Sequence, residues 1–273
     1  MLEKLMNMDR RIIFIFVAVV VIIPTLIPVR LPTRVSEPAQ KLYDYIDGLS
    51  PGETIMLAFD YGPSSLAEPE PMAKVVLRHC FDKGVNVIGV TLYANMPTLA
   101  HGLMQKIAAE NDAVYGEDYV FLGYRPGVLQ VILGMGNNIA GVFETDYSGT
   151  AINEIPMMKN IKNYDQIALL LDLAAGSSTE AWIIYANTRY GLKIGAGVTG
   201  VIIAQMYPFL QTGQLVGLMP GYLGATEYEK LLDAPGDGTI GLNTASFVHV
   251  FLIGLVLLGN IAFFIHRRRG GVD

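Results

Sequence analysis

The sequence predicts an α/β protein with a Rossmann-like, doubly wound and mainly parallel sheet, anchored by one transmembrane helix at each end of the chain. Three observations predict this class. Short uninterrupted apolar runs end in turn residues, as in strands that are buried on both faces. Amphipathic stretches alternate with these runs over short loops, which indicates parallel strands with right-handed crossovers. Two uncharged stretches of membrane-spanning length lie near the chain ends.

The length and composition fit one folded domain between two membrane segments. Of the 273 residues, 52% are hydrophobic, and the two ends leave about 200 residues for a single core. Cys80 is the single cysteine, so no intramolecular disulfide is possible, and we expect it to be a core residue. The middle of the chain has 13 basic against 22 acidic residues. This excess of carboxylates argues against a nucleic-acid partner.

The C-terminal apolar run gives the stronger membrane signal. Residues 247–265 carry no formal charge and would span about 28 Å as a helix. Arg267, Arg268 and Arg269 follow this run, and basic residues near a membrane end stay on the cytoplasmic side. We therefore expect a transmembrane helix at 246–265 and a cytoplasmic tail at 266–273.

The N-terminal apolar run at 12–29 is predicted to be a second transmembrane helix after a cytoplasmic tail at 1–11. A secretory signal peptide is the competing interpretation, but no small-x-small cleavage pattern follows the run. Two spans and an inside C-terminus place both termini in the cytoplasm. The domain between them is then extracytoplasmic, and periplasmic if the cell is Gram-negative.

A linker at 30–37 leads into the first half of the α/β domain, which extends over 38–234. Gly48 and Pro51-Gly52 end the first amphipathic stretch, and Gly84 ends the second. The expected elements are helix 38–47, strand 54–59, helix 68–83, strand 85–92 and helix 97–110.

The second half continues the same alternation with one irregular excursion. Residues 143–162 show little periodicity, and a loop of this length usually has a function or covers something. The apolar run 128–135 fits either a helix or a strand, and we favour a helix. The other expected elements are strand 119–122, strand 167–173, helix 178–190, a strand and its exit at 192–203, helix 208–211, strand 214–219, helix 226–232 and a flexible linker at 235–245.

Polar residues follow the ends of the predicted strands. In open parallel sheets, ligands bind in the crevice at the carboxyl ends of the strands. Asp60 and Asp172 could face each other there as paired carboxylates. The competing interpretation is that strand-to-helix loops favour such residues for capping, and it is the stronger one. The candidate ligand-binding residues are Asp60, Ser64, Ser65, Asn95, Arg125, Asp172, Ser177 and Ser178.

Other patterns point to chemistry only weakly. Residues 195–200 match GxGxxG, the pattern of a dinucleotide-binding loop. Close packing of a glycine-rich strand against a helix explains these glycines better than dinucleotide binding does. Residues 176–179 could bind a small anion, but they suit an ordinary helix N-cap. A serine hydrolase needs a base, and only His101 could approach these loops. We predict no catalytic residues, no metal site and no cofactor.

Two polar residues inside the C-terminal span suggest helix contacts in the membrane. His249 and Asn260 would be costly in lipid without a partner. We therefore expect membrane lipid and a homo-oligomer, other membrane proteins, or both, as partners. The first functional hypothesis is a structural or assembly subunit of a larger membrane complex. The alternatives are a ligand-binding or sensory domain that uses the strand-end crevice and, less favoured, a membrane-tethered hydrolase.

Overall fold

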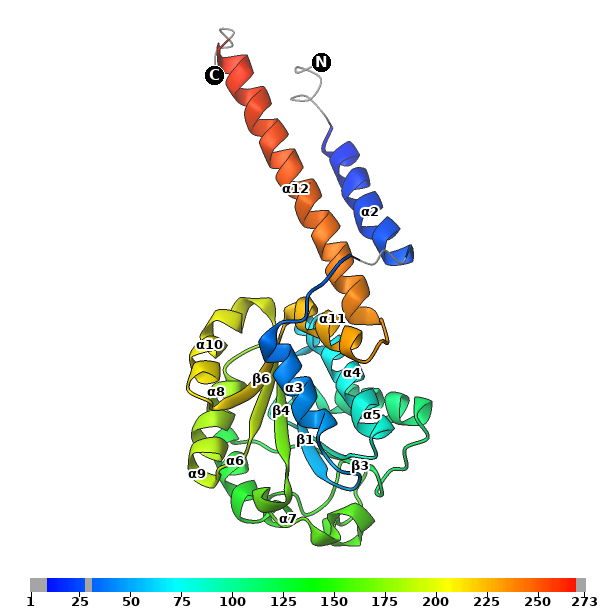
Figure 1. Ribbon diagram of the computed structural model, residues 1–273, viewed down its shortest axis with the longest axis vertical. Coiled ribbons are helices and arrows are strands. Elements are labelled where there is room, and N and C mark those ends of the chain that lie inside the picture. Colours follow the sequence, from blue (N-terminus) through cyan, green and yellow to red (C-terminus); the bar gives the residue numbers. More distant parts are fainter. Residues whose placement is uncertain (1–8, 28–30, 269–273) are drawn as a thin grey trace. The chain divides into compact units, whose positions relative to one another are not determined.

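The computed structural model describes residues 9–27 and 31–268, which belong to two compact units (Figure 1). The α/β unit comprises Thr33–Gly238. The helical unit contains the described residues that precede and follow it in the sequence.

The α/β unit contains a six-stranded sheet in which every pairing is parallel. The strand order is β3-β2-β1-β4-β5-β6, so the direction of winding reverses between β1 and β4. This is the order of the doubly wound α/β fold, and the predicted α/β class with a parallel sheet is confirmed. The strands are β1 (Thr54–Asp60), β2 (Asn86–Thr91), β3 (Tyr119–Tyr124), β4 (Leu169–Ala174), β5 (Ile194–Val198) and β6 (Leu215–Pro220).

Both faces of the sheet are covered by helices, which is why the strands read as continuous apolar runs. Successive side chains alternate between the faces, so Ile55, Leu57 and Phe59 of β1 enter one core while Met56 and Ala58 enter the other. The helices on the Leu57 face are α3 (Glu37–Asp47), α4 (Pro69–Asp82), α5 (Pro97–Glu110) and α11 (Gly221–Leu231).

The Met56 face is covered by the remaining helices and by the irregular excursion. The ambiguous run after β3 is helix α6, as we favoured. Apolar residues of the excursion, including Ile152, Ile155 and Met158, are buried in this core. Its elements are α6 (Val128–Asn137), α7 (Ile139–Val142), η2 (Ile152–Glu154), η3 (Pro156–Asn160), η4 (Tyr164–Gln166), α8 (Ser178–Trp182), the π-helix η5 (Ile183–Asn187), α9 (Thr188–Tyr190), η6 (Gly200–Ile202) and α10 (Ile203–Gln211).

Two helices begin five residues earlier than the sequence predicted. Helix α10 begins at Ile203 and contains Pro208, which the prediction used as the helix start because proline suits a first turn. Helix α11 begins at Gly221 and includes Gly224, and glycine is a poor helix former. An ideal Cβ on Gly224 would lie 2.4 Å from the Met219 carbonyl carbon, so close packing rather than helix propensity decides this residue.

Helix α12 (Asp237–Arg268) is the one helix of the described residues that is long and apolar enough to cross a membrane. An 18-residue window within Asp237–Ile265 has a mean hydropathy of 2.4. The helix begins inside the segment expected to be a flexible linker at 235–245.

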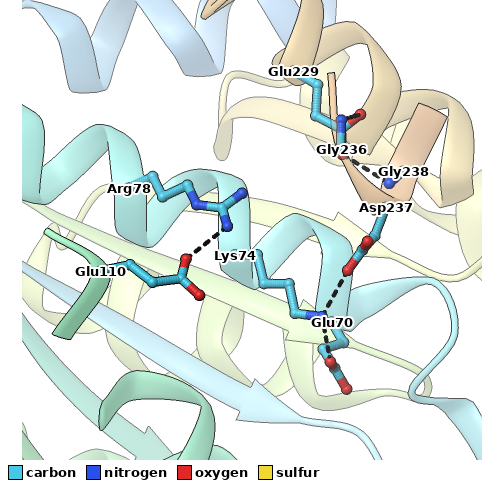
Figure 2. A network of polar contacts seen from close by, with 8 residues as sticks. All are labelled: Glu70, Lys74, Arg78, Glu110, Glu229, Gly236, Asp237 and Gly238. Atoms are coloured by element: carbon cyan, nitrogen blue, oxygen red, sulfur yellow. Dashed lines mark hydrogen bonds and ion pairs between the residues drawn. The ribbon is translucent and has the colours of Figure 1, made fainter. Parts of the chain in front are cut away.

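The first turn of α12 is held by polar contacts within the α/β unit (Figure 2). Glu229 of α11 accepts hydrogen bonds from the backbone amides of Gly236 (2.9 Å) and Gly238 (2.7 Å). Lys74 of α4 forms an ion pair of 2.7 Å with Asp237. The amides at a helix start lack intrahelical partners, so these contacts give α12 a defined beginning.

The N-terminal helix α2 (Arg10–Leu26) has 17 residues and includes Pro24. In the helical unit, the hydroxyl oxygens of Thr25 and Thr244 lie 3.2 Å apart, so α2 and α12 meet at this point. The last two residues of the expected span at 12–29 lie outside the described residues. The second span therefore stays a prediction.

Candidate functional site

The two carboxyl groups singled out in the sequence lie together where the strand order reverses. Asp60 is the last residue of β1, and Asp172 is in the neighbouring strand β4. Asp60 is paired with Ala174, and Ala58 with Asp172, so the two aspartates are diagonal neighbours on one face. Both side chains are fully buried.

Asp60 uses its two oxygens to join three elements. Oδ1 accepts the backbone amide of Leu92, after β2, at 2.7 Å. Oδ2 accepts the indole N–H of Trp182 in α8 at 2.8 Å. These donors favour the ionised form, but burial outweighs them and raises the pKa of Asp60 to about 6.

Asp172 is the more strongly perturbed group. Its Oδ2 accepts hydrogen bonds from the hydroxyls of Ser178 (3.1 Å) and Thr179 (2.6 Å) at the start of α8. Burial and then the charge of Asp60 raise the pKa of Asp172 well above its usual value. Oδ1 of Asp172 is buried without a hydrogen-bond partner in the described residues, and each carboxyl group affects the pKa of the other. Because the pKa of Asp172 is the more strongly raised, Asp172 is the carboxyl group that holds a proton beside Asp60.

Polar residues at the same strand ends form a second, more exposed layer. The amide nitrogen of Asn95 and the hydroxyl of Ser64 lie 3.9 Å and 4.0 Å from an ideal Cβ on Gly62. The hydroxyl of Tyr93 lies 2.8 Å from an ideal Cβ on Gly176, and burial followed by the charges of Asp60 and Asp172 raises the pKa of Tyr93. We call this layer the carboxyl-edge cluster: Gly62, Ser64, Tyr93, Asn95, Gly176 and Ser177.

Other predicted site residues have contacts elsewhere. Ser65 ends the short helix η1 (Pro63–Ser65). The guanidinium of Arg125 lies 5.1 Å from the ring centre of Phe143 and donates to the Tyr124 carbonyl. Neither contact joins these residues to the acid pair.

His101 does not form a catalytic pair in the described chain. Its ring stacks on Phe121 at 5.8 Å and meets Tyr147 edge-on at 5.0 Å. Burial lowers its pKa. No hydrogen bond of the described residues joins His101 to a serine, so the geometry offers no support for the hydrolase hypothesis.

The glycine-rich strand β5 packs closely, as the preferred interpretation of GxGxxG required. An ideal Cβ on Gly195 would lie 2.7 Å from Leu42 of α3. One on Gly197 would lie 2.7 Å from Leu173 and 2.8 Å from Met72 of α4. These glycines allow helices to approach the sheet, which explains two of the three glycines of the motif.

The usual phosphate position of this fold is acidic here. Dinucleotide-binding folds hold the pyrophosphate at the N-terminus of the helix after the first strand. In this chain that helix, α4, begins with Pro69 and Pro71, which lack N–H donors, and carries Glu70 in its first turn. Glu68 already accepts the amide of Gly200 at 2.8 Å. Both features disfavour an anion.

Sequence reasoning missed Trp182 and Thr179. Trp182 is the only tryptophan of the chain and is fully buried. A π-helix follows it directly, and such widened turns are frequent at functional sites. The isolated tryptophan in a helix that follows a strand was the one available signal.

His249 and Asn260, the two polar residues singled out in α12, form no interhelical bond among the described residues. The Asn260 side chain donates to the Val256 carbonyl of its own helix at 2.8 Å and is exposed. His249 is also exposed.

Metal-ligating residues do not gather in the described chain: no group of three or more His, Cys, Asp or Glu side chains could hold a metal ion. Cys80 is buried in the core, and burial raises its thiol pKa.

Comparison with known proteins gives no further assignment. No family model, curated protein or solved structure matches this chain.

Proposed function

We propose that this chain is a membrane-anchored ligand-binding domain, which takes a small uncharged or cationic polar ligand at the carboxyl-edge cluster. One observation carries the proposal. At the position where doubly wound sheets bind ligands, Ser64, Asn95 and Ser177 lie in the segments that follow β1, β2 and β4, and β1 and β4 carry the buried pair of carboxyl groups with raised pKa values.

The charge of the site selects the ligand class. The acid pair, Glu68 and Glu70 supply negative charge, while Pro69 and Pro71 remove amide donors. A phosphate or carboxylate would be repelled, and a polyol or an amine would be accepted.

Trp182 provides a specific readout of binding, because the single indole N–H of the chain donates to Asp60. We expect glycerol and ethylammonium to shift the indole NMR resonance of the full chain in detergent, and acetate and phosphate to leave it unchanged. Asn95→Ala should weaken the response, whereas Asn160→Ala, at the opposite edge of the sheet, should not. A response to phosphate alone, or one insensitive to Asn95→Ala, contradicts the proposal.

The proposed topology has two spans, with both termini in the cytoplasm and the α/β domain outside. Its support is the basic tail that begins at Arg267 and the helical α2. A cysteine at the exposed position of Glu144 should react with a membrane-impermeant maleimide in intact cells, while buried Cys80 should not. Labelling only after lysis would disprove the topology.

A second candidate function, assembly into a membrane oligomer, rests on Asn260. Its amide is exposed on an apolar helix and forms one hydrogen bond, to its own backbone, so it retains groups that could bind another helix. Asn260→Leu should reduce the particle mass in detergent, with Gly259→Leu as a control for bulk at an adjacent position. A monomeric wild-type particle removes this candidate.

A further inference from the structure

A cavity of about 510 Å³ lies at the amino edge of the sheet, opposite the acid pair. The first residues of β1 and β2 and the segment that leads into β4 form one side, and the irregular excursion forms the other. The volume falls within the range of small-molecule sites. We call this feature the amino-edge cavity; residues that line it include Glu53, Asn86, Met157, Asn160, Ile161 and Asp165.

Several polar side chains around this cavity have no partner among the residues that the structure describes. Asn86, Asn160 and Asp165 form no side-chain hydrogen bond or ion pair in the described part of the chain. Glu53 accepts the Ser50 amide at 2.6 Å through Oε2. The side chains of Asn86, Asn160 and Asp165 can therefore form hydrogen bonds with a ligand, whereas Asp60 and Asp172 are buried and already accept hydrogen bonds from the protein.

The charge and shape of the lining favour a cation with an apolar body. Glu53 and Asp165 are acidic, and the cavity lining includes no lysine, arginine or histidine. Helices that connect parallel strands end at the amino edge, where their terminal carbonyls also favour positive charge. Pro156, Met157 and Ile161 supply apolar surface beside these groups.

We propose that the amino-edge cavity is a second binding site, which takes a small organic ammonium ion. The positive charge of this ligand lies between Glu53 and Asp165, and its alkyl part contacts Met157. The side-chain amide oxygens of Asn86 and Asn160 accept hydrogen bonds from its N–H groups. This inference is independent of the carboxyl-edge site.

The methyl group of Met157 makes the proposal testable with n-butylammonium as the probe. In the full chain labelled with ¹³C at methionine methyls, titration should shift the Met157 resonance and leave that of Met206, a buried residue of α10, unchanged. Asp165→Asn should weaken binding about two- to fivefold, the range for one exposed ion pair. Glu144→Gln, an exposed carboxylate outside the cavity lining, is the matched control.

Two analogues, one uncharged and one negatively charged, test whether the cavity recognises the positive charge of the ligand. Butanol should bind more weakly than butylammonium, and butyrate should not move Met157. The proposal is overturned if Met157 does not respond, if butanol or butyrate acts as strongly, or if Asp165→Asn changes nothing. The Trp182 resonance reports the carboxyl-edge site separately, so each site can fail alone.

Discussion

At the carboxyl edge of the sheet the deepest polar groups are hydrogen-bonded within the protein, whereas at the amino edge the side chains of Asn86, Asn160 and Asp165 lack partners in the described residues. Asp60 and Asp172 are fully buried, and they accept hydrogen bonds from Leu92 after β2 and from residues of α8. Asn160 and Asp165 are exposed. The same residue types therefore serve stability at one edge and remain available to ligands at the other.

This contrast separates two meanings of a polar residue at a strand end. A buried carboxyl group is costly unless it is hydrogen-bonded or protonated, and the acid pair meets both conditions. An exposed carboxylate needs neither. Substitutions at the two edges should therefore differ widely in their effect on stability.

The largest effect is expected for Asp60→Asn. An amide has one acceptor oxygen, so its NH₂ group would face either the Leu92 amide or the Trp182 indole N–H. The variant should lose about 3 kcal/mol of unfolding free energy. Urea unfolding of the detergent-solubilised chain, followed by Trp182 fluorescence, measures the loss.

Asp165→Asn at the amino edge is the matched control for this substitution. It should change the unfolding free energy by less than about 0.5 kcal/mol. Equal losses for the two variants would remove the contrast between the edges.

The acid pair should also make stability depend on pH. The folded state raises the pKa of Asp60 from 3.8 to about 6, so it binds the proton more tightly than the unfolded chain. The resulting stabilisation is present at low pH and is lost as pH rises, by about 2 kcal/mol between about pH 4 and pH 6. Unfolding free energies across this window measure it.

Asp172→Asn separates the contributions of the two carboxyl groups. Its amide oxygen would accept from Ser178 and Thr179, so the variant should fold normally at pH 7. It should keep the decline between about pH 4 and pH 6, because burial is the main cause of the raised pKa of Asp60. It should lose the further decline at higher pH that the raised pKa of Asp172 adds. Loss of the decline between about pH 4 and pH 6 would mean that burial is not what raises the pKa of Asp60.

The sequence predicted the sheet well because apolar runs and turn residues are local signals. Each strand expected from a run such as 54–59 or 167–173 is present. Strands β1 and β4 are neighbours in the sheet, so Asp60 and Asp172 lie close together. Burial of the pair was not predictable, because it depends on Trp182, which is more than a hundred residues from Asp60 in the sequence.

The amino-edge cavity could not be predicted from the sequence for a related reason. Its walls come from strand starts and from an irregular excursion without periodicity, so no local pattern places Asp165 near Glu53. The early starts of α10 and α11 were missed because Pro208 and Gly224 obscure helical periodicity. Tertiary packing decides such segments.

A smaller loss of unfolding free energy is expected for substitutions at the glycines of β5. Gly197→Ala places a methyl group against Leu173 and Met72 and should cost about 1 to 2 kcal/mol of unfolding free energy. Gly102→Ala in α5 is the control, since nothing lies within 4 Å of its ideal Cβ. It should stabilise the chain by about 0.5 to 1 kcal/mol. Thermal unfolding of both variants tests whether packing, rather than a ligand, explains the motif.

The smallest effect concerns the start of α12, which polar groups of α4 and α11 hold (Figure 2). Glu229→Gln leaves one carbonyl oxygen for the two amides of Gly236 and Gly238 and removes a negative charge from a helix N-terminus. We expect a loss of about 1 kcal/mol, which makes amide hydrogen exchange at Gly238 about fivefold faster. Arg78→Met removes the ion pair between α4 and α5 and should leave that amide unchanged. If the two variants exchange alike, the carboxylate of Glu229 does not fix the beginning of α12.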